Sequence, residues 1–178
     1  MDRPAKLPGD YVAGFVDGEG CFALKFRRDR KQNLGNKKFR DYFYWGLELA
    51  VVLRADDLPL LISIQTTLKC GKINSLKNNQ ARFSVQNPKE ICEKVIPFFK
   101  KYLIRGKKGM DFKLWSEGAH IIQKYRDGQL NVKRGRQGFI KKEMSLEDLR
   151  KLKEIRNQMI EYKSKRTQPF KWQGNVAE

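Results

Sequence analysis

Two acidic residues, Asp17 and Glu19, stand among glycines and are the first candidates for chemistry. Glu19 falls where an apolar helical pattern ends, and the negative end of a helix dipole disfavours a carboxylate by a few tenths to about 1 kcal/mol. A cation is therefore expected nearby. Gly18 and Gly20 leave the backbone carbonyls accessible, and carboxylate and carbonyl oxygens are the ligands that Mg²⁺ or Ca²⁺ prefers. An ordinary helix-to-strand turn with solvated carboxylates is the alternative.

A short helix over residues 10–18 must hold this acidic exit in place. Val12, Phe15 and Val16 recur at helical spacing, and Asp10 is the predicted N-cap. The helix should end at the glycines. Ala13 and Gly14 add little side-chain bulk, so a second helix could approach almost backbone to backbone.

The composition indicates a single domain, residues 1–178, whose partner is strongly anionic. A hydrophobic content of 40% suffices for a core, while 38 Lys and Arg against 20 Asp and Glu give a net charge of +18. Nucleic acid is favoured over a membrane surface, and a merely solvated charged surface is the alternative. The chain has no run of 18 apolar residues, so we expect an intracellular protein without a membrane span. Cys21, Cys70 and Cys92 are predicted to be reduced core thiols, and His120 a packed structural histidine.

A long basic hairpin follows the acidic exit. Residues 22–28 alternate, with Phe22, Leu24 and Phe26 toward the core, and residues 41–54 form the return strand. The basic side chains should contact phosphates: Lys25, Arg27, Arg28, Arg30, Lys31, Lys37, Lys38 and Arg40. The outer face of the return strand mixes donors, acceptors and aromatic rings suited to base edges: Tyr42, Tyr44, Glu48 and Arg54.

A second hairpin, over residues 72–76 and 81–86, lies between two predicted helices. The first helix covers residues 56–68 and is closed by Gly71, and the second starts at Asn87 and runs to Pro97 and the apolar Phe98-Phe99. The hairpin's polar side chains are further candidates for base reading: Lys72, Asn74, Arg82, Ser84 and Gln86.

The remaining chain is predicted to be helical, apart from a basic connector. One helix begins near Met110 and continues through Ile122; the last is capped by Ser145 and carries an apolar stripe: Leu146, Leu149, Leu152, Ile155, Met159 and Tyr162. The order of elements indicates an α+β fold with helices on one face of an antiparallel sheet. The other face, basic and polar, has ribbons that could enter a DNA major groove.

Residues 12–20, Val-Ala-Gly-Phe-Val-Asp-Gly-Glu-Gly, resemble the LAGLIDADG motif of homing endonucleases, and Gly71-Lys72-Ile73 and Asp111-Phe112-Lys113-Leu114-Trp115 resemble further segments of that family. The resemblance covers about residues 9–125, leaving a connector and helix at 126–164 and a tail at 165–178. It implies an αββαββα domain with a saddle-shaped antiparallel sheet, plus C-terminal helices. Because the chain has one motif, it also implies a homodimer and a nearly palindromic target. The implied dimer interface comprises Tyr11, Val12, Ala13, Gly14, Phe15 and Asp17.

The same resemblance implies a metal-dependent endonuclease that leaves short 3′ overhangs. Glu19 matches the catalytic metal-binding acid, and the Gly18 carbonyl matches a backbone ligand. Mg²⁺ would be the cofactor, with Mn²⁺ tolerated and Ca²⁺ supporting binding. Lys108, or else Lys107, matches an accessory lysine; either could instead only contact phosphate. Where the family often has a glutamine, this chain has Val52-Leu53-Arg54, so Arg54 would have to substitute.

The implied partner is double-stranded DNA, with intron RNA as a further candidate, in a bacterial or archaeal cytoplasm or an organelle matrix. A non-cleaving nucleic-acid-binding protein on the same fold, either an intron RNA maturase or a transcription regulator, is the alternative. Such proteins commonly lose the acidic metal ligand, so Glu19 favours the intron-encoded nuclease.

Overall fold

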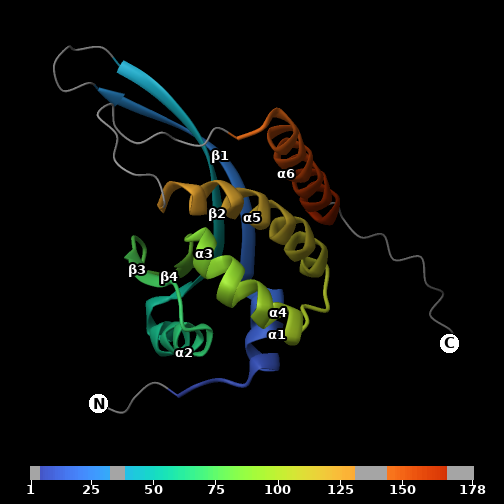
Figure 1. Cartoon of the computed structure of the whole chain (residues 1–178). Helices are drawn as coiled ribbons and strands as arrows, with labels where there is room; N and C mark the ends of the chain where they lie inside the picture. Colours follow the sequence, from blue (N-terminus) through green and yellow to red (C-terminus); the bar gives the residue numbers. More distant parts are fainter. Residues whose placement is uncertain (1–4, 33–38, 131–143, 168–178) are drawn as a thin grey trace, which may run out of the picture.

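The computed structural model describes residues 5–32, 39–130 and 144–167 (Figure 1). The first elements are helix α1 (Gly9–Glu19), strands β1 (Gly20–Gln32) and β2 (Phe39–Arg54), a 3₁₀ turn (Ala55–Asp57) and helix α2 (Leu58–Leu68). Strands β3 (Lys72–Leu76) and β4 (Gln80–Val85) follow. The chain then forms α3 (Pro88–Glu90), a π-helical segment η2 (Ile91–Val95), α4 (Ile96–Lys101), α5 (Lys108–Leu130) and α6 (Leu146–Thr167). The predicted α+β order is confirmed.

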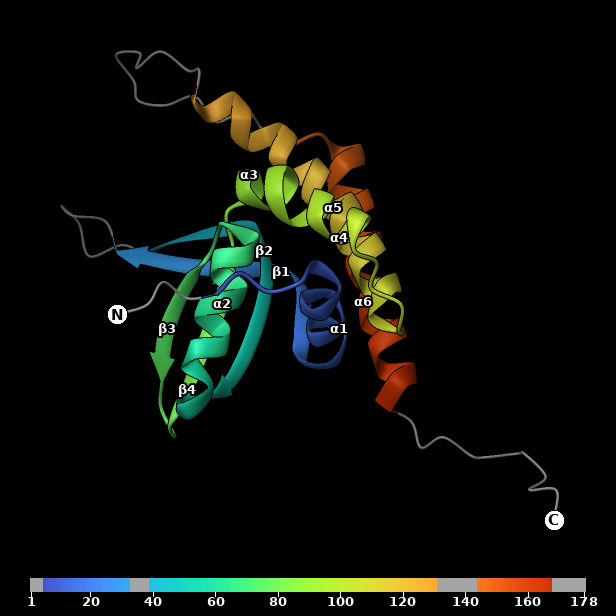
Figure 2. The same cartoon turned by 90° about the horizontal axis from the view of Figure 1, so that it is seen from below.

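The four strands form one antiparallel sheet in the order β1-β2-β4-β3. Helix α2 packs on β2 and β4, and α5 packs on β1 and β2, while α6 lies against α5 (Figures 1 and 2). On the opposite face of the sheet, side chains such as Arg27, Tyr44 and Val52 are exposed. The sheet therefore has a helix-covered face and an open face, as the alternation predicted.

The core joins α1, the sheet and α5. Val12, Val16, Phe83 and Trp115 are all 0% exposed. The indole Nε1 of Trp115 donates a hydrogen bond to the Ala23 carbonyl at 3.1 Å, which satisfies its polar group inside the core. This packing fixes the end of α1 relative to the start of β1 and to α5.

Four side chains predicted to be buried are exposed. Phe26 is 48% exposed, because the β1–β2 hairpin extends beyond the helices, although its ring lies 5.0 Å from that of Trp45. Cys21 faces away from the core by strand alternation, and His120 is exposed beside the buried Ala119. Leu146, the first residue of α6, is 73% exposed, so the packed stripe begins later.

Helix boundaries differ from the sequence predictions at two places. Helix α1 begins at Gly9 with Pro8 in the N-cap position, so the prediction that Asp10 is the N-cap was wrong; Asp10 lies in the first turn. The helical segment that starts after Asn87 continues through Pro97 to Lys101, two residues beyond the predicted Phe98-Phe99. A proline ring would clash with the carbonyl four residues earlier in a regular α-helix, and the π-helical turn over Ile91–Val95 widens the helix at this point.

The C-terminal helix begins as predicted, because the Asp148 amide donates to the Ser145 hydroxyl at 3.1 Å. None of the described helices is long and apolar enough to cross a membrane.

Candidate active site and nucleic-acid interface

The end of α1 presents the acidic residues in two different ways. Glu19, the last residue of the helix, is exposed. Asp17 is half-buried, and its carboxylate accepts a hydrogen bond from the Gly106 amide at 2.6 Å. At Gly20, where β1 begins, a Cβ would lie 2.6 Å from the Val16 carbonyl oxygen, so only glycine fits this turn. The local backbone thus leaves Glu19 available and ties Asp17 to the loop before α5.

Lys108 is the cation that the exit of α1 was expected to attract. It is the first residue of α5, and its Nζ donates hydrogen bonds to the Gly18 carbonyl and, at 3.5 Å, to the Val16 carbonyl. A cation at these carbonyls stabilises the C-terminus of a helix. Lys107, one residue earlier, is exposed. Of the two candidate lysines, Lys108 is the one whose side chain reaches the exit of α1.

The oxygen atoms at this exit are of the type that binds a divalent cation. The Glu19 carboxylate and the Gly18 carbonyl are hard donors on adjacent residues, which fits Mg²⁺ or Ca²⁺. Among the described residues, however, no group of three or more His, Cys, Asp or Glu side chains could hold a metal ion.

Arg54 lies apart from Glu19, Gly18 and Lys108, and its guanidinium group pairs with a neighbouring residue instead. The side chain is 74% exposed and forms an ion pair with Asp56 at 3.0 Å. Gly20 pairs with Val51, so Arg54 lies three residues farther along β2, roughly 10 Å at the usual rise of a strand.

The exposed side of α1 differs from the expected dimer interface. Val12 and Ala13 are 0% and 1% exposed and pack into their own core, so they cannot face a partner in this fold. The Asp17 carboxylate accepts a hydrogen bond from the Gly106 amide of the same chain, so it too is engaged within its own fold.

The side of α1 that faces outward consists of one strip, which we call the α1 strip: Tyr11, Gly14, Phe15 and Gly18. Their spacing places them on one helical face. Tyr11 is 48% exposed and stacks on the half-buried Phe15, with ring centroids 6.2 Å apart. A Cβ at Gly14 or Gly18 would meet no atom within 4 Å. The strip is therefore flat and open where it approaches Glu19.

The open face of the sheet carries most of the predicted DNA-contacting residues. Exposed side chains from this set on the open face are Arg27, Tyr44, Lys72, Asn74 and Gln86. Arg28 and Arg30 are also exposed, but they alternate to the same face of β1 as Phe26, where the hairpin extends beyond the helices. Ser84 is only 7% exposed, so its hydroxyl is less accessible than the sequence suggested. Arg40 and Tyr42 belong to β2, but their side chains lie outside the described part, as do Lys31, Lys37 and Lys38.

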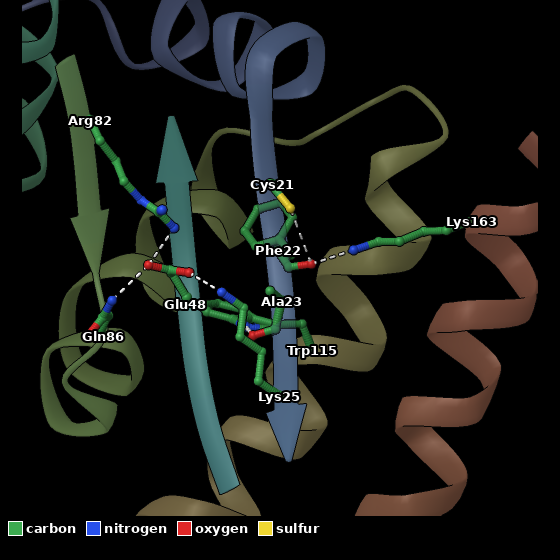
Figure 3. A network of polar contacts seen from close by, with 9 residues as sticks. All are labelled: Cys21, Phe22, Ala23, Lys25, Glu48, Arg82, Gln86, Trp115 and Lys163. Carbon is green, nitrogen blue, oxygen red and sulfur yellow. Dashed lines mark hydrogen bonds and ion pairs between the residues drawn. The ribbon is translucent and has the colours of Figure 1, made fainter. Parts of the chain in front are cut away.

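Glu48 is the main departure on this face, because it was expected to point toward a partner but is 3% exposed. Its carboxylate accepts from Lys25 Nζ at 2.6 Å, from Arg82 Nη2 at 2.7 Å and from Gln86 Nε2 at 2.7 Å (Figure 3). Burial alone would raise the pKa of Glu48, but the hydrogen bonds from Lys25 and Gln86 and the charges of Lys25 and Arg82 lower it overall. Alternation placed Glu48 on the correct face. Glu48 is an acidic residue among basic ones in the sequence, and this was the signal that neighbouring cations would form ion pairs with it.

Comparison with known proteins is consistent with this arrangement. The family model described as "LAGLIDADG endonuclease" matches residues 12–119. A protein of Mycosarcoma maydis named "probable intron-encoded DNA endonuclease 1" is 32% identical over 103 residues, which are 57% of this chain and 34% of the relative. The chain therefore spans about a third of the length of that curated relative.

Two solved structures show the same fold. I-SmaMI bound to uncleaved DNA target in the presence of calcium ions superposes with a TM-score of 0.67 at 24% identity, covering 90% of this chain and 48% of that chain. The homing endonuclease I-TnaI superposes with a TM-score of 0.64 at 22% identity, covering 90% of this chain and 99% of that chain. With the motif on α1, the open antiparallel sheet and a family model that matches more than half of its residues, the chain belongs to the LAGLIDADG endonuclease family.

Proposed function

We propose that this chain is one subunit of a homodimeric homing endonuclease that makes a double-strand break in a long, nearly palindromic DNA target. The observation that carries the proposal is the open α1 strip that leads to an exposed Glu19 beside Lys108. Since Gly14 and Gly18 add no side chain to this strip, a second copy of α1 could pack against it closely. Two-fold packing there would bring two Glu19 residues together and predict a nearly palindromic target.

The extents of the superpositions support one copy of the fold within these 178 residues. The same described fold corresponds to nearly the whole chain of I-TnaI and to about half of the chain of I-SmaMI. These 178 residues carry one motif helix, so a second copy of the fold is needed to build a two-fold centre.

The proposed reaction is phosphodiester hydrolysis that leaves short 3′ overhangs. Two Glu19 carboxylates near a two-fold axis would repel each other, and a divalent cation held by Glu19 and the Gly18 carbonyl would offset that repulsion. Such a cation, which we propose is Mg²⁺, would supply the Lewis acidity needed to activate water and to stabilise negative charge at phosphorus. The Lys108 ammonium, located at the same exit, would add positive charge beside the scissile phosphate. We expect Mn²⁺ to substitute and Ca²⁺ to support binding, as the calcium-containing DNA complex of I-SmaMI suggests.

The open face of the sheet would bind the DNA. Basic side chains along the first hairpin would neutralise phosphates, which positions the protein without reading sequence: Arg27, Arg28, Arg30, Lys37, Lys38 and Arg40. Lys25, which lies beside Glu48, would contact base edges instead. Polar side chains on the open face, including Tyr44, Asn74, Arg82 and Gln86, would read base edges. By analogy with the relative's name, the reading frame would lie in an intron, and the protein would act in a compartment that contains DNA.

The decisive experiment selects cleaved sites from a partly palindromic duplex library with Mg²⁺. We expect one family of symmetric sites, cut on both strands, and no cutting after chelation. Glu19→Gln should bind the selected site without cutting it, whereas Glu117→Gln, a matched change at an exposed residue of α5, should cut normally. Full cleavage by Glu19→Gln would refute the assignment of the acid, and a stable monomer on DNA in sedimentation would refute the dimer.

A further inference from the structure

Glu48 joins three strands of the open sheet through its carboxylate. It lies on β2, opposite Ala23 of β1, and β2 is hydrogen-bonded to both β1 and β4. Lys25 reaches the carboxylate from β1, Arg82 from β4, and Gln86 from the residue after β4 (Figure 3). Side chains that are 23 to 38 residues from Glu48 in sequence thus share one anionic group.

This arrangement leaves Glu48 poorly suited to contact DNA itself. Its Oε2 accepts from Lys25, and its Oε1 accepts from both Arg82 and Gln86. A carboxylate has about four acceptor sites, so most are used, and the residue is 3% exposed.

The three partners keep hydrogen-bonding capacity on the exposed side. The side chains of Lys25 and Arg82 are 38% and 31% exposed, and Gln86 is exposed. An ionised carboxylate only accepts, so the Gln86 amide must turn its Nε2 toward Glu48, and Oε1 then points away from it, as Figure 3 shows. Gln86 therefore offers an acceptor and its second N–H in a fixed orientation.

Fixing these side chains before binding affects how well they discriminate among bases. A free Lys or Arg side chain loses rotamer entropy when a contact orders it, and an unrestrained amide can present either of its ends. Held by Glu48, the three side chains lose less entropy on binding and present one pattern of donors and acceptors.

We propose that Glu48 is a positioning residue that holds Lys25, Arg82 and Gln86 in the arrangement that discriminates among base pairs, without touching DNA itself. This inference rests on the proposed function, in which the open sheet face binds DNA. The positioning role of Glu48 has an electrostatic consequence that can be measured. Replacing Glu48 by Gln removes a negative charge, so general attraction to phosphates is retained or increased while the fixed arrangement is lost.

The test measures dissociation constants for the selected target and for a random duplex. We expect Glu48→Gln to lower the ratio of target to random affinity by about 10-fold or more, the loss expected when a base-reading contact is misplaced, with random-DNA affinity unchanged or higher. Glu93→Gln is the matched control, since it makes the same charge change at a side chain 57% exposed, and should leave the ratio unchanged. Arg82→Lys should cost less discrimination in the Glu48→Gln background than in the wild type.

Two outcomes would overturn the inference: an unchanged ratio, whether or not both affinities fall, or altered preference at one base pair alone, which would mean that Glu48 reads a base. Absence of any preference in the wild type would instead contradict the proposed function. Glu48→Asp, which keeps the charge but shortens the side chain by one methylene, should give a smaller loss of the same kind and serves if Glu48→Gln does not fold.

Positioning can also be measured without DNA. In the free protein, the NMR signals of the Gln86 side-chain amide and of the Arg82 Nε–H should show restricted motion in the wild type and greater motion in Glu48→Asp and Glu48→Gln. The same mobility in the wild type and both folded variants would overturn the inference whatever the protein does with DNA.

Discussion

Lys108 donates hydrogen bonds from its ammonium group to the Gly18 carbonyl, one residue before the exposed Glu19. The first residue of α5 is thereby fixed at the last turn of α1, although 90 positions separate the two in sequence. This contact stabilises the negative end of α1 and also places a cation beside the proposed catalytic acid. The two effects can be separated by experiment.

Replacing Lys108 by Met should lower both stability and cleavage. Loss of the charged contact with the α1 carbonyls should cost about 1 kcal/mol of unfolding free energy. Cleavage of the selected site should fall by more than this loss explains, whereas Lys107→Met, at the exposed neighbour, should change both little. Urea unfolding and single-turnover cleavage measure the two quantities, and equal behaviour of the two variants would contradict a special role for Lys108.

A bulky residue at Gly14 should prevent assembly without disturbing the fold. Gly14→Leu meets no atom within 4 Å of its Cβ in the single chain, and leucine favours the helix over glycine by roughly 0.5–1 kcal/mol. We therefore expect equal or higher monomer stability, a shift from dimer to monomer in sedimentation, and loss of double-strand cleavage.

Gln158→Leu, at an exposed position of α6, adds a similar apolar surface away from the α1 strip and should leave the dimer intact. A Gly14→Leu protein that remained dimeric would place the interface elsewhere.

Cys70 should make stability fall at alkaline pH. Burial, reinforced by the nearby Glu90 carboxylate, raises the pKa of the Cys70 thiol from 9.0 to about 11, with Lys94 opposing the shift. The neutral thiol is favoured in the folded state, so the contribution is fully present below pH 9 and is lost as pH rises toward 11, by about 2 to 3 kcal/mol.

Urea unfolding at pH 8 and pH 10.5 should therefore show a larger decrease for the wild type than for Cys70→Ala, which controls for the lysines and tyrosines that titrate in this range. Identical decreases would contradict the assignment.

Removing a phosphate contact should weaken binding to all sequences alike. Arg27→Gln, on the open face of β1, should lower the affinity for target and random duplexes by similar factors and reduce the salt slope by about 1. Lys100→Gln on α4 makes the same charge change on an exposed helix outside the sheet and should have little effect. Filter binding at several salt concentrations distinguishes the two, and a loss confined to the target would mean that Arg27 reads a base.

The sequence was sufficient to predict features that depend on neighbouring residues. Strand alternation placed Phe22 and Leu24 toward the core, and the capping pattern located Ser145 at the start of α6. The end of α1 near Glu19 followed from the glycines. These features are local, so a short window contains the information that determines them.

The errors concern side chains whose environment is made by distant segments. Burial of Glu48 depends on Lys25 and Arg82, which come from two other strands. Alternation alone could not show that they would cover it. Likewise, small size suggested Ala13 as an interface residue, but the sheet and α5 determine which face of α1 turns inward, and only Gly14 of the pair is exposed.

The hydrogen bond from the Gly106 amide to Asp17 links the loop before α5 to α1 within a single chain. Glu19 and Lys108 therefore hold their relative places whether or not a second copy is present. Each subunit would bring its own Glu19 and Lys108, already in position, to the DNA and would cut one strand. A mixed dimer of one wild-type and one Glu19→Gln subunit should then nick supercoiled plasmid to the open circle and stop, making one subunit's chemistry visible on its own.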